Sequence, residues 1–316
     1  MKILVRVPNW LGDAVFSLAL VKELRKKHEV SILVKSHLKN LFYEFETYTF
    51  SSYSDLFKKS LKLRGYDGFL TIPISFSSAL SGYLTGAPRR VGFSFDCRDF
   101  LLTHRIKIPS DWKFKHTMWT YIKLLEPFDI YLNEIPYPKF IPSPEDVEKA
   151  EELLRIYQVN NYISVAPFTA FGTAKEWGVE NFEKLALLFQ EKGIQMVILG
   201  TKKEHGRAER IKDKNVINLC GKTTLGMAAH ISKKSLAFVG NDSGLTHLAA
   251  AAGAKTIAIF GPTSPTWTAP LGSSVTVLYK PPPCSPCEKR TCPLGTKICM
   301  KIITPEEVAG KIQDTQ

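Results

Sequence analysis

A short polar segment in the last third of the chain has the residue types of an anion-binding turn. Asn241, Asp242, Ser243 and Gly244 separate a strand-like run from an alanine-rich helix that also carries His247. The first turn of a helix presents unpaired N–H groups and the positive end of the helix dipole, and a glycine there lets a ligand approach the backbone. The segment therefore predicts a site for an anion such as a diphosphate. The alternatives are that Asp242 or Ser243 only caps the helix, and that His247 is a buried core histidine.

A second loop offers a cation and a hydroxyl group to the same anion. Residues 167–177 follow a strand-like run and contain Thr169, Gly172 and Lys175. A glycine after a strand permits close backbone approach, a threonine adds a hydroxyl donor, and a lysine can neutralise a phosphate. The loop thus predicts a phosphate-binding role for Lys175, with an ordinary surface lysine as the alternative.

A carboxylate that could move a proton stands near the start of the chain. The first strand-like run is followed by Asn9 and Trp10, and then by Gly12 and Asp13. A carboxylate at the carboxyl end of a strand is a candidate general base. The alternative is that Asp13 is only the N-cap of the helix expected over Ala14–Lys27.

Two absent motifs narrow the chemistry further. The Gly-Lys-Thr of residues 221–223 resembles the end of a P-loop, but Val216 stands where that motif needs its first glycine, so a P-loop ATPase is excluded. The chain also has no Asp-x-Asp pair with which a sugar transferase could hold its nucleotide through a divalent metal. A metal-free transferase would instead need Lys175 and a helix N-terminus to stabilise the leaving group.

The elements that must position these residues alternate between strand and helix, which predicts an α/β fold with parallel sheets. The expected strands are Lys2–Val7, Val30–Val34, Gly68–Ile72, Tyr162–Ala166, Gln195–Leu199, Val216–Leu219, Leu236–Gly240 and Thr256–Phe260. The expected helices are Ala14–Lys27, Ser77–Leu84, Pro144–Tyr157, Asn181–Lys192, Lys202–Lys212, Leu225–Ser232 and Leu245–Ala252.

The length of the chain and one linker predict two domains. A chain of 316 residues exceeds a typical single core. Residues 135–144 hold four prolines, and Ser143 then starts a helix in the manner of a capping box. We expect domains over residues 1–155 and 156–302, with a short terminal helix over residues 303–316. Ligands of open parallel sheets bind beyond the carboxyl ends of the strands, here in a cleft between the domains.

The formal net charge of +12 favours an anionic partner. Between Arg89 and Lys123 there are eight Lys or Arg residues and three Asp. Nucleic acid, acidic lipid headgroups or a phosphorylated substrate would suit this segment, and a solvated basic face is the alternative. The chain carries no signature of a nucleic-acid-binding fold, so we expect no nucleic-acid partner.

The composition is typical of a globular protein. Hydrophobic residues make up 44% of the chain and charged residues 23%. No apolar run approaches the roughly 18–20 residues of a membrane span. The first residues lack the basic, apolar and small-residue pattern of a secretory signal, so we expect a cytoplasmic protein.

Four of the six cysteines form a cluster near the end of the chain. They are Cys284, Cys287, Cys292 and Cys299. In a cytosolic protein such a cluster suggests a structural metal more than disulfides, but the spacing is not a standard zinc pairing. A metal site is therefore the less favoured interpretation, and free or occasionally oxidised thiols are the alternative.

Several segments resemble glycosyltransferase family 9, and the resemblance spans nearly the whole chain. They are PNWLGDAVFSLAL, SFSSALSGYLTGAPRRVGF, TAFGTAKEWGVENF and VGNDSGLTHLAAAAGAKTIAIFGPTSPTWTAPLG. The segment CSPCEKRTCPLG resembles one that only some members carry, which argues against a catalytic role for its cysteines. The resemblance implies a GT-B fold of two Rossmann-like domains, with the acceptor on the first and the ADP-sugar on the second. It also implies that the terminal helix packs back on the first domain.

The resemblance also implies which residues act. Asp13 would be the base and Lys175 would bind phosphate. The expected donor-binding residues are Thr169, Gly172, Lys175, Thr223, Thr224, Asn241, Asp242, Ser243, Gly244 and His247. The expected acceptor-binding residues are Asn9, Trp10, Gly12, Arg89 and Arg90. The implied transfer is inverting and needs neither a metal nor another cofactor.

The implied substrates are a sugar nucleotide and a lipid. Within the family the likeness is greatest to members that move L-glycero-D-manno-heptose from ADP-heptose to the inner core of lipopolysaccharide, as the second heptose on heptosyl-Kdo-lipid A. The partners would be ADP-heptose, an anionic lipopolysaccharide precursor and the cytoplasmic membrane surface, to which the enzyme would bind peripherally. Alternatives are transfer of the first heptose or another sugar, a non-catalytic nucleotide-sugar-binding protein, and a metal-dependent protein centred on the cysteine cluster.

Overall fold

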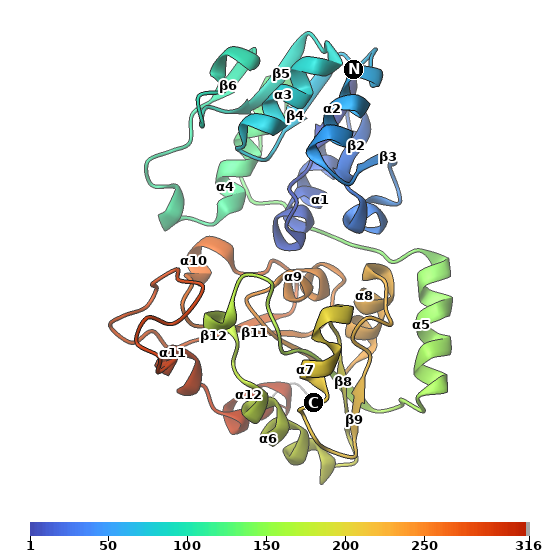
Figure 1. Ribbon diagram of the computed structural model, residues 1–316, viewed down its shortest axis with the longest axis vertical. Coiled ribbons are helices and arrows are strands. Elements are labelled where there is room, and N and C mark those ends of the chain that lie inside the picture. Colours follow the sequence, from blue (N-terminus) through green and yellow to red (C-terminus); the bar gives the residue numbers. More distant parts are fainter. Residues whose placement is uncertain (314–316) are drawn as a thin grey trace. The chain divides into compact units, whose positions relative to one another are not determined.

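The computed structural model describes residues 1–313, and the last three residues of the expected terminal helix lie outside the described part. The chain divides into two compact units, Met1–Pro138 and Lys139–Gln316. Each unit contains one six-stranded sheet in which all neighbouring strands are parallel (Figure 1). The predicted α/β class with two Rossmann-like units is confirmed.

The first unit has the strand order β3-β2-β1-β4-β5-β6. Its strands are β1 (Lys2–Arg6), β2 (Glu29–Lys35), β3 (Glu46–Phe50), β4 (Gly68–Thr71), β5 (Arg89–Phe93) and β6 (His104–Ile106). Its helices are α1 (Leu11–Arg25), α2 (Tyr53–Lys62), α3 (Phe76–Thr85) and α4 (Thr117–Tyr121), with 3₁₀ turns at Ser36–Phe42, Asp99–Leu101, Trp112–Phe114 and Ile122–Phe128. β2 and β3 lie on one side of β1, and β4, β5 and β6 lie on the other, so the strand order reverses between β1 and β4. Sheets of this kind bind ligands at such a reversal.

The second unit has the order β12-β11-β10-β7-β8-β9, which is the same topology traced from the other edge. Its strands are β7 (Tyr162–Ala166), β8 (Gln195–Ile198), β9 (Val216–Asn218), β10 (Phe238–Asn241), β11 (Thr256–Phe260) and β12 (Val275–Tyr279). Its helices are α5 (Pro144–Ile156), α6 (Val179–Gln190), α7 (His205–Ala208), α8 (Leu225–Lys234), α9 (Gly244–Ala251), α10 (Pro265–Thr268), α11 (Ile298–Lys301) and α12 (Pro305–Gln313). Here the reversal lies between β7 and β10.

The period of two along the strands separates two cores in the second unit. Ile163 and Val165 of β7 point into a core that also holds Val308 of α12. The alternate residues Tyr162 and Ala166 point into a core shared with α5, α8 and α9. Because a strand presents successive side chains to opposite faces, this near-continuous apolar run is what a sheet covered on both faces requires.

The structure bears on the predicted domain boundary and on the predicted packing of the terminal helix. The units divide at residue 138, before α5, since α5 packs on α8 and Ala150 and Leu154 are buried in the second unit. Helix α12 packs on α6, and its Val308 and Ile312 lie in the core of its own unit. The terminal helix thus contributes its apolar face to the core of the second unit, and its predicted packing on the first domain stays a prediction.

Four further elements differ from the prediction. Helix α1 begins at Leu11, so Asp13 lies inside its first turn and Trp10 occupies the N-cap position. The helix expected over 202–212 is a 3₁₀ turn, Lys202–Glu204, followed by the single turn α7. The edge strands β3 and β12 follow no continuous apolar run, because most of their side chains are only half-buried.

Candidate functional site

The two predicted anion-binding segments meet at the strand reversal of the second unit. Asp242 directly follows β10, and Lys175 ends the 3₁₀ turn Thr173–Lys175 in the loop after β7. The Lys175 Nζ lies 2.5 Å from Asp242 Oδ2, and the two side chains are 13% and 6% exposed. β7 and β10 are hydrogen-bonded neighbours, so the sheet itself brings the two loops together.

Asp242 is held ionised by three groups. The Thr263 hydroxyl donates to its Oδ2 at 2.7 Å, and His247 Nε2 lies 3.7 Å from its Oδ1. Burial alone would raise the pKa of Asp242, but the hydrogen bond from His247 and the charge of Lys175 outweigh it and hold the pKa at about 2. Asp242 therefore orients Lys175 and cannot take up a proton at neutral pH.

The start of α9 keeps its first N–H groups available. Ser243 occupies the N-cap position, but its side chain makes no capping hydrogen bond. Its hydroxyl instead lies 3.2 Å from the Thr246 hydroxyl. The first turn of a helix has N–H groups that no helical carbonyl can accept, and the positive end of the dipole lies there. The predicted anion site at Gly244 thus has the necessary donors, and the simple capping alternative is not supported.

Asn241 has a different task from the predicted one. Its side chain is fully buried, its Oδ1 accepts from the Trp177 N–H at 3.0 Å, and its Nδ2 donates to the Pro167 carbonyl at 2.7 Å. Both ends of the amide are therefore occupied by the loop after β7. Asn241 fixes that loop against β10 and so helps to position Lys175, and its predicted donor-binding role stays a prediction.

Thr169 and Gly172 shape the same loop. The Thr169 hydroxyl donates to the Gly172 carbonyl at 2.8 Å. A Cβ at Gly172 would lie 2.3 Å from the backbone carbonyl oxygen of Arg290, so only glycine fits where these two segments touch. The glycine that we expected beside the donor is needed for packing on the cysteine-containing segment.

Thr223 and Thr224 lie in the loop after β9. The Thr224 hydroxyl caps α8 by accepting from the Met227 N–H, and it donates to Asp146 of α5 at 2.5 Å. Its side chain therefore joins α8 to α5 and is not free for a nucleotide. Thr223 is half-buried, and its predicted donor-binding role stays a prediction.

In the first unit, the candidate base is in a different setting. Asp13 is half-buried in the first turn of α1, and the Tyr121 hydroxyl donates to its Oδ1 at 3.3 Å. Burial raises the pKa of Tyr121 well above its usual value, and the nearby Asp13 charge adds to the effect. The phenol thus stays protonated and remains a hydrogen-bond donor to the carboxylate.

The segment before Asp13 is held by a buried arginine. The Arg6 guanidinium donates to Asn9 Oδ1 at 2.6 Å and to the Val7 carbonyl. Burial lowers the pKa of Arg6 to about 9, and a smaller opposing effect comes from Tyr53. The Asn9 carbonyl oxygen is therefore engaged, whereas Trp10 is 54% exposed beside it.

Arg89 and Arg90 do not lie near the candidate base. They begin β5, whereas the base follows the carboxyl end of β1, so the two features lie at opposite edges of a parallel sheet. Arg89 donates to the Pro127 carbonyl at 2.6 Å, and Arg90 donates to the carbonyls of Leu101 and Ala87, both at 2.8 Å. Their guanidinium groups are bonded to backbone carbonyls, and the predicted acceptor-binding role stays a prediction.

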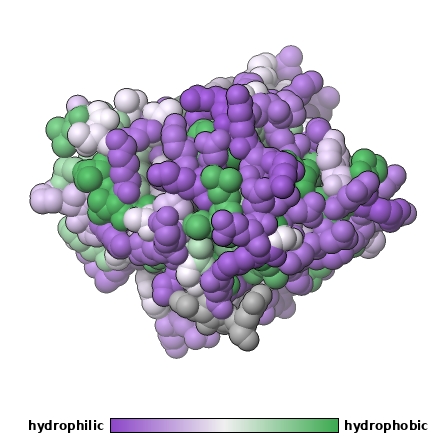
Figure 2. Space-filling model, turned by 90° about the horizontal axis from the view of Figure 1, so that it is seen from below, coloured by the Kyte–Doolittle hydropathy of each residue, from purple (hydrophilic) through white to green (hydrophobic). Residues whose placement is uncertain are grey.

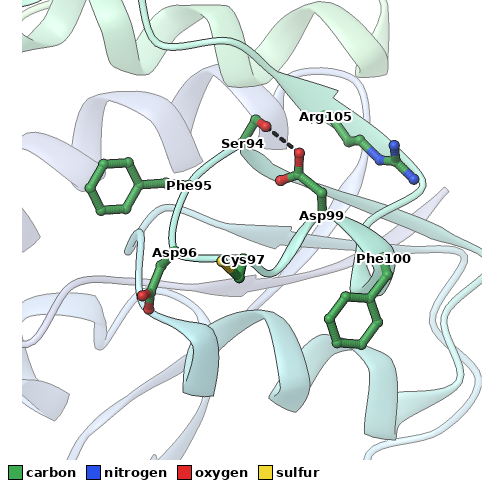
Figure 3. A pocket seen from close by; sticks show the side chains of 7 residues that line it. All are labelled: Ser94, Phe95, Asp96, Cys97, Asp99, Phe100 and Arg105. Carbon is green, nitrogen blue, oxygen red and sulfur yellow. Dashed lines mark hydrogen bonds between the residues drawn. The ribbon is translucent and has the colours of Figure 1, made fainter.

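The carboxyl end of β5 opens into a pocket that the sequence did not suggest (Figure 3). The pocket has a volume of about 540 Å³. It is lined by Ser94, Phe95, Asp96, Cys97, Asp99, Phe100 and Arg105. The Phe95 and Phe100 rings project in different directions from the loop and are 53% and 69% exposed.

The pocket's loop is firmly held from beneath. The fully buried Arg98 donates to the carbonyls of Phe93, Pro73 and Ser75. Within residues 1–313, the buried Oδ1 of Asp99 has no hydrogen-bond partner. The pocket thus combines exposed aromatic faces, a carboxylate with spare accepting capacity and the Arg105 guanidinium.

The four clustered cysteines line one small cavity, together with Ala174 of the loop after β7. All four are free thiols, and the Lys297 N–H points at Cys292 Sγ over 3.4 Å. In the part of the chain that the structure describes, no three His, Cys, Asp or Glu side chains are arranged to hold a metal ion.

The surface offers no membrane-spanning element. No helix of residues 1–313 has both the length and the apolar character to cross a bilayer. The face drawn in Figure 2 is mainly hydrophilic, with hydrophobic residues in small separate groups.

Sequence reasoning missed two residues of these sites. Tyr121 lies 108 positions from Asp13, and only the packing of α4 against α1 reveals the contact. Thr263 had a detectable signal, because it stands in a polar turn directly after the buried strand β11, at the same sheet edge as Asp242.

Comparison with known proteins gives a consistent result. Residues 56–298 match glycosyltransferase family 9 (heptosyltransferase). The chain is 28% identical to lipooligosaccharide heptosyltransferase 2 of Campylobacter jejuni, over 99% of this chain and 98% of that one. It is 26% identical to lipopolysaccharide heptosyltransferase 2 of Escherichia coli, over 88% of each. The solved structure of E. coli ADP-heptose lps heptosyltransferase II superposes with a TM-score of 0.85 at 25% identity, covering 99% of this chain and 97% of that one.

Proposed function

Because the chain belongs to glycosyltransferase family 9, we propose that it transfers L-glycero-D-manno-heptose from ADP-heptose to the inner core of lipopolysaccharide. The relatives named heptosyltransferase 2 support transfer of the second heptose, onto heptosyl-Kdo-lipid A. The near-complete coverage of both chains supports a full-length relationship and not one shared domain.

The proposed reaction is a single displacement. An acceptor hydroxyl oxygen forms a bond to the anomeric carbon of the heptose while the bond from that carbon to the diphosphate breaks. Asp13 takes the hydroxyl proton, and ADP leaves with the electron pair, so the configuration at the anomeric carbon is inverted. Lys175 and the N–H groups at the start of α9 stabilise the charge that develops on the ADP. No metal or other cofactor has a role in this proposal.

The observation that carries the proposal is the Lys175–Asp242 ion pair beside the start of α9. It places a fixed cation and free helix N–H groups at the strand reversal, where a sugar nucleotide would bind. Neither Asp242 nor Asn241 needs to touch the nucleotide, since both act by holding Lys175 and its loop.

Two defined acceptors test the proposal. The purified protein is incubated with ADP-heptose and with Kdo-lipid A that carries either no heptose or one heptose. We expect heptose incorporation and ADP release with the monoheptosylated acceptor only. Transfer to the heptose-free acceptor would make the protein a first-heptose transferase. ADP binding without transfer to either acceptor would indicate a non-catalytic nucleotide-sugar-binding protein.

We place part of the acceptor in the pocket after β5. The Phe93 ring at the end of β5 lies 6.4 Å from the ring of Tyr121, which in turn contacts Asp13. The pocket therefore begins one residue beyond a chain of contacts that leads to the base. Its exposed Phe95 and Phe100 offer apolar faces to a sugar ring, while Asp99 and Arg105 can bond sugar hydroxyl or anionic groups.

A basic and aromatic segment supports contact with a membrane surface. Of the eight cations that the sequence suggested, Arg98 is buried and Arg89 and Arg90 bond to carbonyls. Among those that remain, Lys107, Lys113 and Lys115 are exposed near Phe114, which is itself 80% exposed. Lys115 is paired with Asp111 at 2.6 Å. We propose that residues 107–119 bind anionic headgroups at the cytoplasmic leaflet. Co-sedimentation with anionic vesicles that does not weaken with salt would contradict this.

A further inference from the structure

The Lys175 site by itself is nearly neutral. The ammonium of Lys175 is paired with the ionised carboxylate of Asp242, so the two charges largely cancel. The diphosphate of a sugar nucleotide carries more than one negative charge, and the dipole at the start of α9 supplies only about half a positive charge. The residues that the sequence singled out therefore leave part of the ligand's charge unmatched.

A second cation stands beside Lys175. The Nζ of Lys175 lies 4.6 Å from the centre of the Phe171 ring, and the guanidinium carbon of Arg290 lies 5.2 Å from the same ring. Within residues 1–313, the Arg290 guanidinium has no hydrogen-bond partner and no carboxylate partner, and its side chain is exposed. Two like charges contact one ring, and only Lys175 is paired with a carboxylate, so an anion would stabilise the arrangement.

The backbone of residues 288–290 is hydrogen-bonded to the loops after β7 and β11. The Arg290 carbonyl oxygen accepts from the Ala174 N–H at 3.0 Å, one residue before Lys175. The contact with Gly172 is so close that no side chain fits there. Two residues earlier, the Glu288 N–H donates to the Pro262 carbonyl at 2.7 Å, next to the threonine that holds Asp242.

The segment that carries Arg290 also contains the four clustered cysteines. Cys284, Cys287, Cys292 and Cys299 line the cavity beneath the loop, and Arg290 lies between the second and third of them. Backbone N–H groups, first among them that of Lys297, surround Cys292 Sγ and lower its pKa. The segment thus surrounds the small cavity that the cysteines line, and it carries the exposed Arg290.

We propose that Arg290 binds the diphosphate of the donor together with Lys175, and that the cysteine-containing segment exists to present it. The inference rests on the proposed function, because it requires a nucleoside diphosphate at this site. A planar guanidinium can donate two parallel hydrogen bonds to phosphate oxygens, which the ammonium of Lys175 cannot do.

Calorimetric titration with ADP and with adenosine tests the inference. Arg290→Ala should weaken ADP binding by about 10- to 100-fold, the range for a lost charge-assisted hydrogen bond, and leave adenosine binding unchanged. Lys289→Ala removes the same charge from the same loop without a contact to Phe171, and we expect its ADP affinity to stay within about twofold of wild type. Arg290→Lys should recover part of the loss.

The outcomes separate the two proposals. If wild type binds ADP and Arg290→Ala binds it equally well, Arg290 does not contact the diphosphate and the inference is wrong while the function stands. If Arg290→Ala weakens ADP and adenosine alike, the residue only supports the fold. If wild type binds neither ADP nor ADP-heptose, the proposed function fails and the inference fails with it.

Discussion

The two units share one topology, but the loop after the first strand of each leads to a side chain of opposite charge. In both sheets the reversal lies beside the first strand of the unit, β1 or β7. In the first unit, the chain passes from β1 to α1 within four residues, so the first helical turn carries a carboxylate, Asp13. In the second unit, residues 167–178 separate β7 from α6, and this longer loop carries the cation Lys175. The fold determines where a side chain can contact a ligand, and the loop between the strand and the next helix determines whether that side chain is a carboxylate or an ammonium.

The partners of the two carboxylates differ in the same way. Asp13 accepts a hydrogen bond from the neutral phenol of Tyr121, whereas Asp242 is paired with the charge of Lys175 and has a pKa of about 2. Environments that separate two like groups in this manner assign them different roles. One carboxylate is suited to take a proton, and the other serves as a fixed counter-charge.

Replacing the base should have the largest effect. Asp13→Asn keeps the size of the side chain but removes the proton acceptor, and general base catalysis contributes typically about 10²- to 10⁴-fold. We expect kcat to fall by about that factor while the Kd for ADP stays unchanged, because the proposed donor site lies in the other unit. Steady-state kinetics and ADP titration measure the two quantities. Weakened ADP binding with normal turnover would reverse the comparison between the units.

Removing the cation should have the next largest effect and a different signature. Lys175→Ala removes charge stabilisation of the leaving ADP, for which a loss of about 10²- to 10³-fold is typical. We expect kcat to fall and the KM for ADP-heptose to rise together, with the acceptor KM unchanged. A change confined to the acceptor KM would contradict the division of tasks.

Much of the fold was predictable because the central strands are buried on both faces. The bounds of β7 and β11 match the prediction, and Ser143 caps α5 as expected. The edge strands β3 and β12 escaped notice, since half-buried strands have no continuous apolar run. Propensity also places a helix start poorly, which is why Asp13 was weighed as an N-cap.

The site was predictable where polar residues directly follow buried strands. Lys175 and Asp242 stand directly after neighbouring parallel strands, so their meeting follows from the topology. Arg89 and Arg90 were predicted to bind the acceptor, but they stand at the start of β5. Two adjacent charges in a sequence do not reveal at which end of a strand they lie. The contact of Tyr121 with Asp13 depends on tertiary packing across 108 positions, and no local pattern encodes it.

Removing an aromatic side chain from the proposed acceptor pocket should have a smaller effect, limited to the first unit. Phe100→Ala removes an exposed aromatic face from the pocket, and we expect the acceptor KM to rise about tenfold, which corresponds to roughly 1.4 kcal/mol. The Kd for ADP should not change. Tyr131→Ala is the matched control, since this tyrosine is 72% exposed in the same unit and does not line the pocket. Equal acceptor KM values for both variants would remove the pocket from the acceptor site.

The smallest effect should come from the partner of the base. Tyr121→Phe keeps the ring near Phe93 but removes the hydroxyl that donates to Asp13. A hydrogen bond to an ionised carboxylate favours that form, so its loss makes the carboxylate easier to protonate. We therefore expect the acidic limb of the kcat/KM profile to move to higher pH, with a loss of about three- to tenfold near the limb, as one hydrogen bond allows.

A matched variant in the second unit makes this reading specific. Tyr162 is also buried, and its hydroxyl donates to the Ile231 carbonyl at 2.9 Å, away from either carboxylate. Tyr162→Phe removes a comparable hydrogen bond, so it should lower thermal stability without moving the pH profile. If both variants leave the pH profile in place, Tyr121 only packs against α1. The hydrogen bond from Tyr121 then does not explain why Asp13 and Asp242 have different roles. A shift confined to Tyr121→Phe would tie the proton-transfer role of the first unit to the Tyr121 hydroxyl that donates to Asp13.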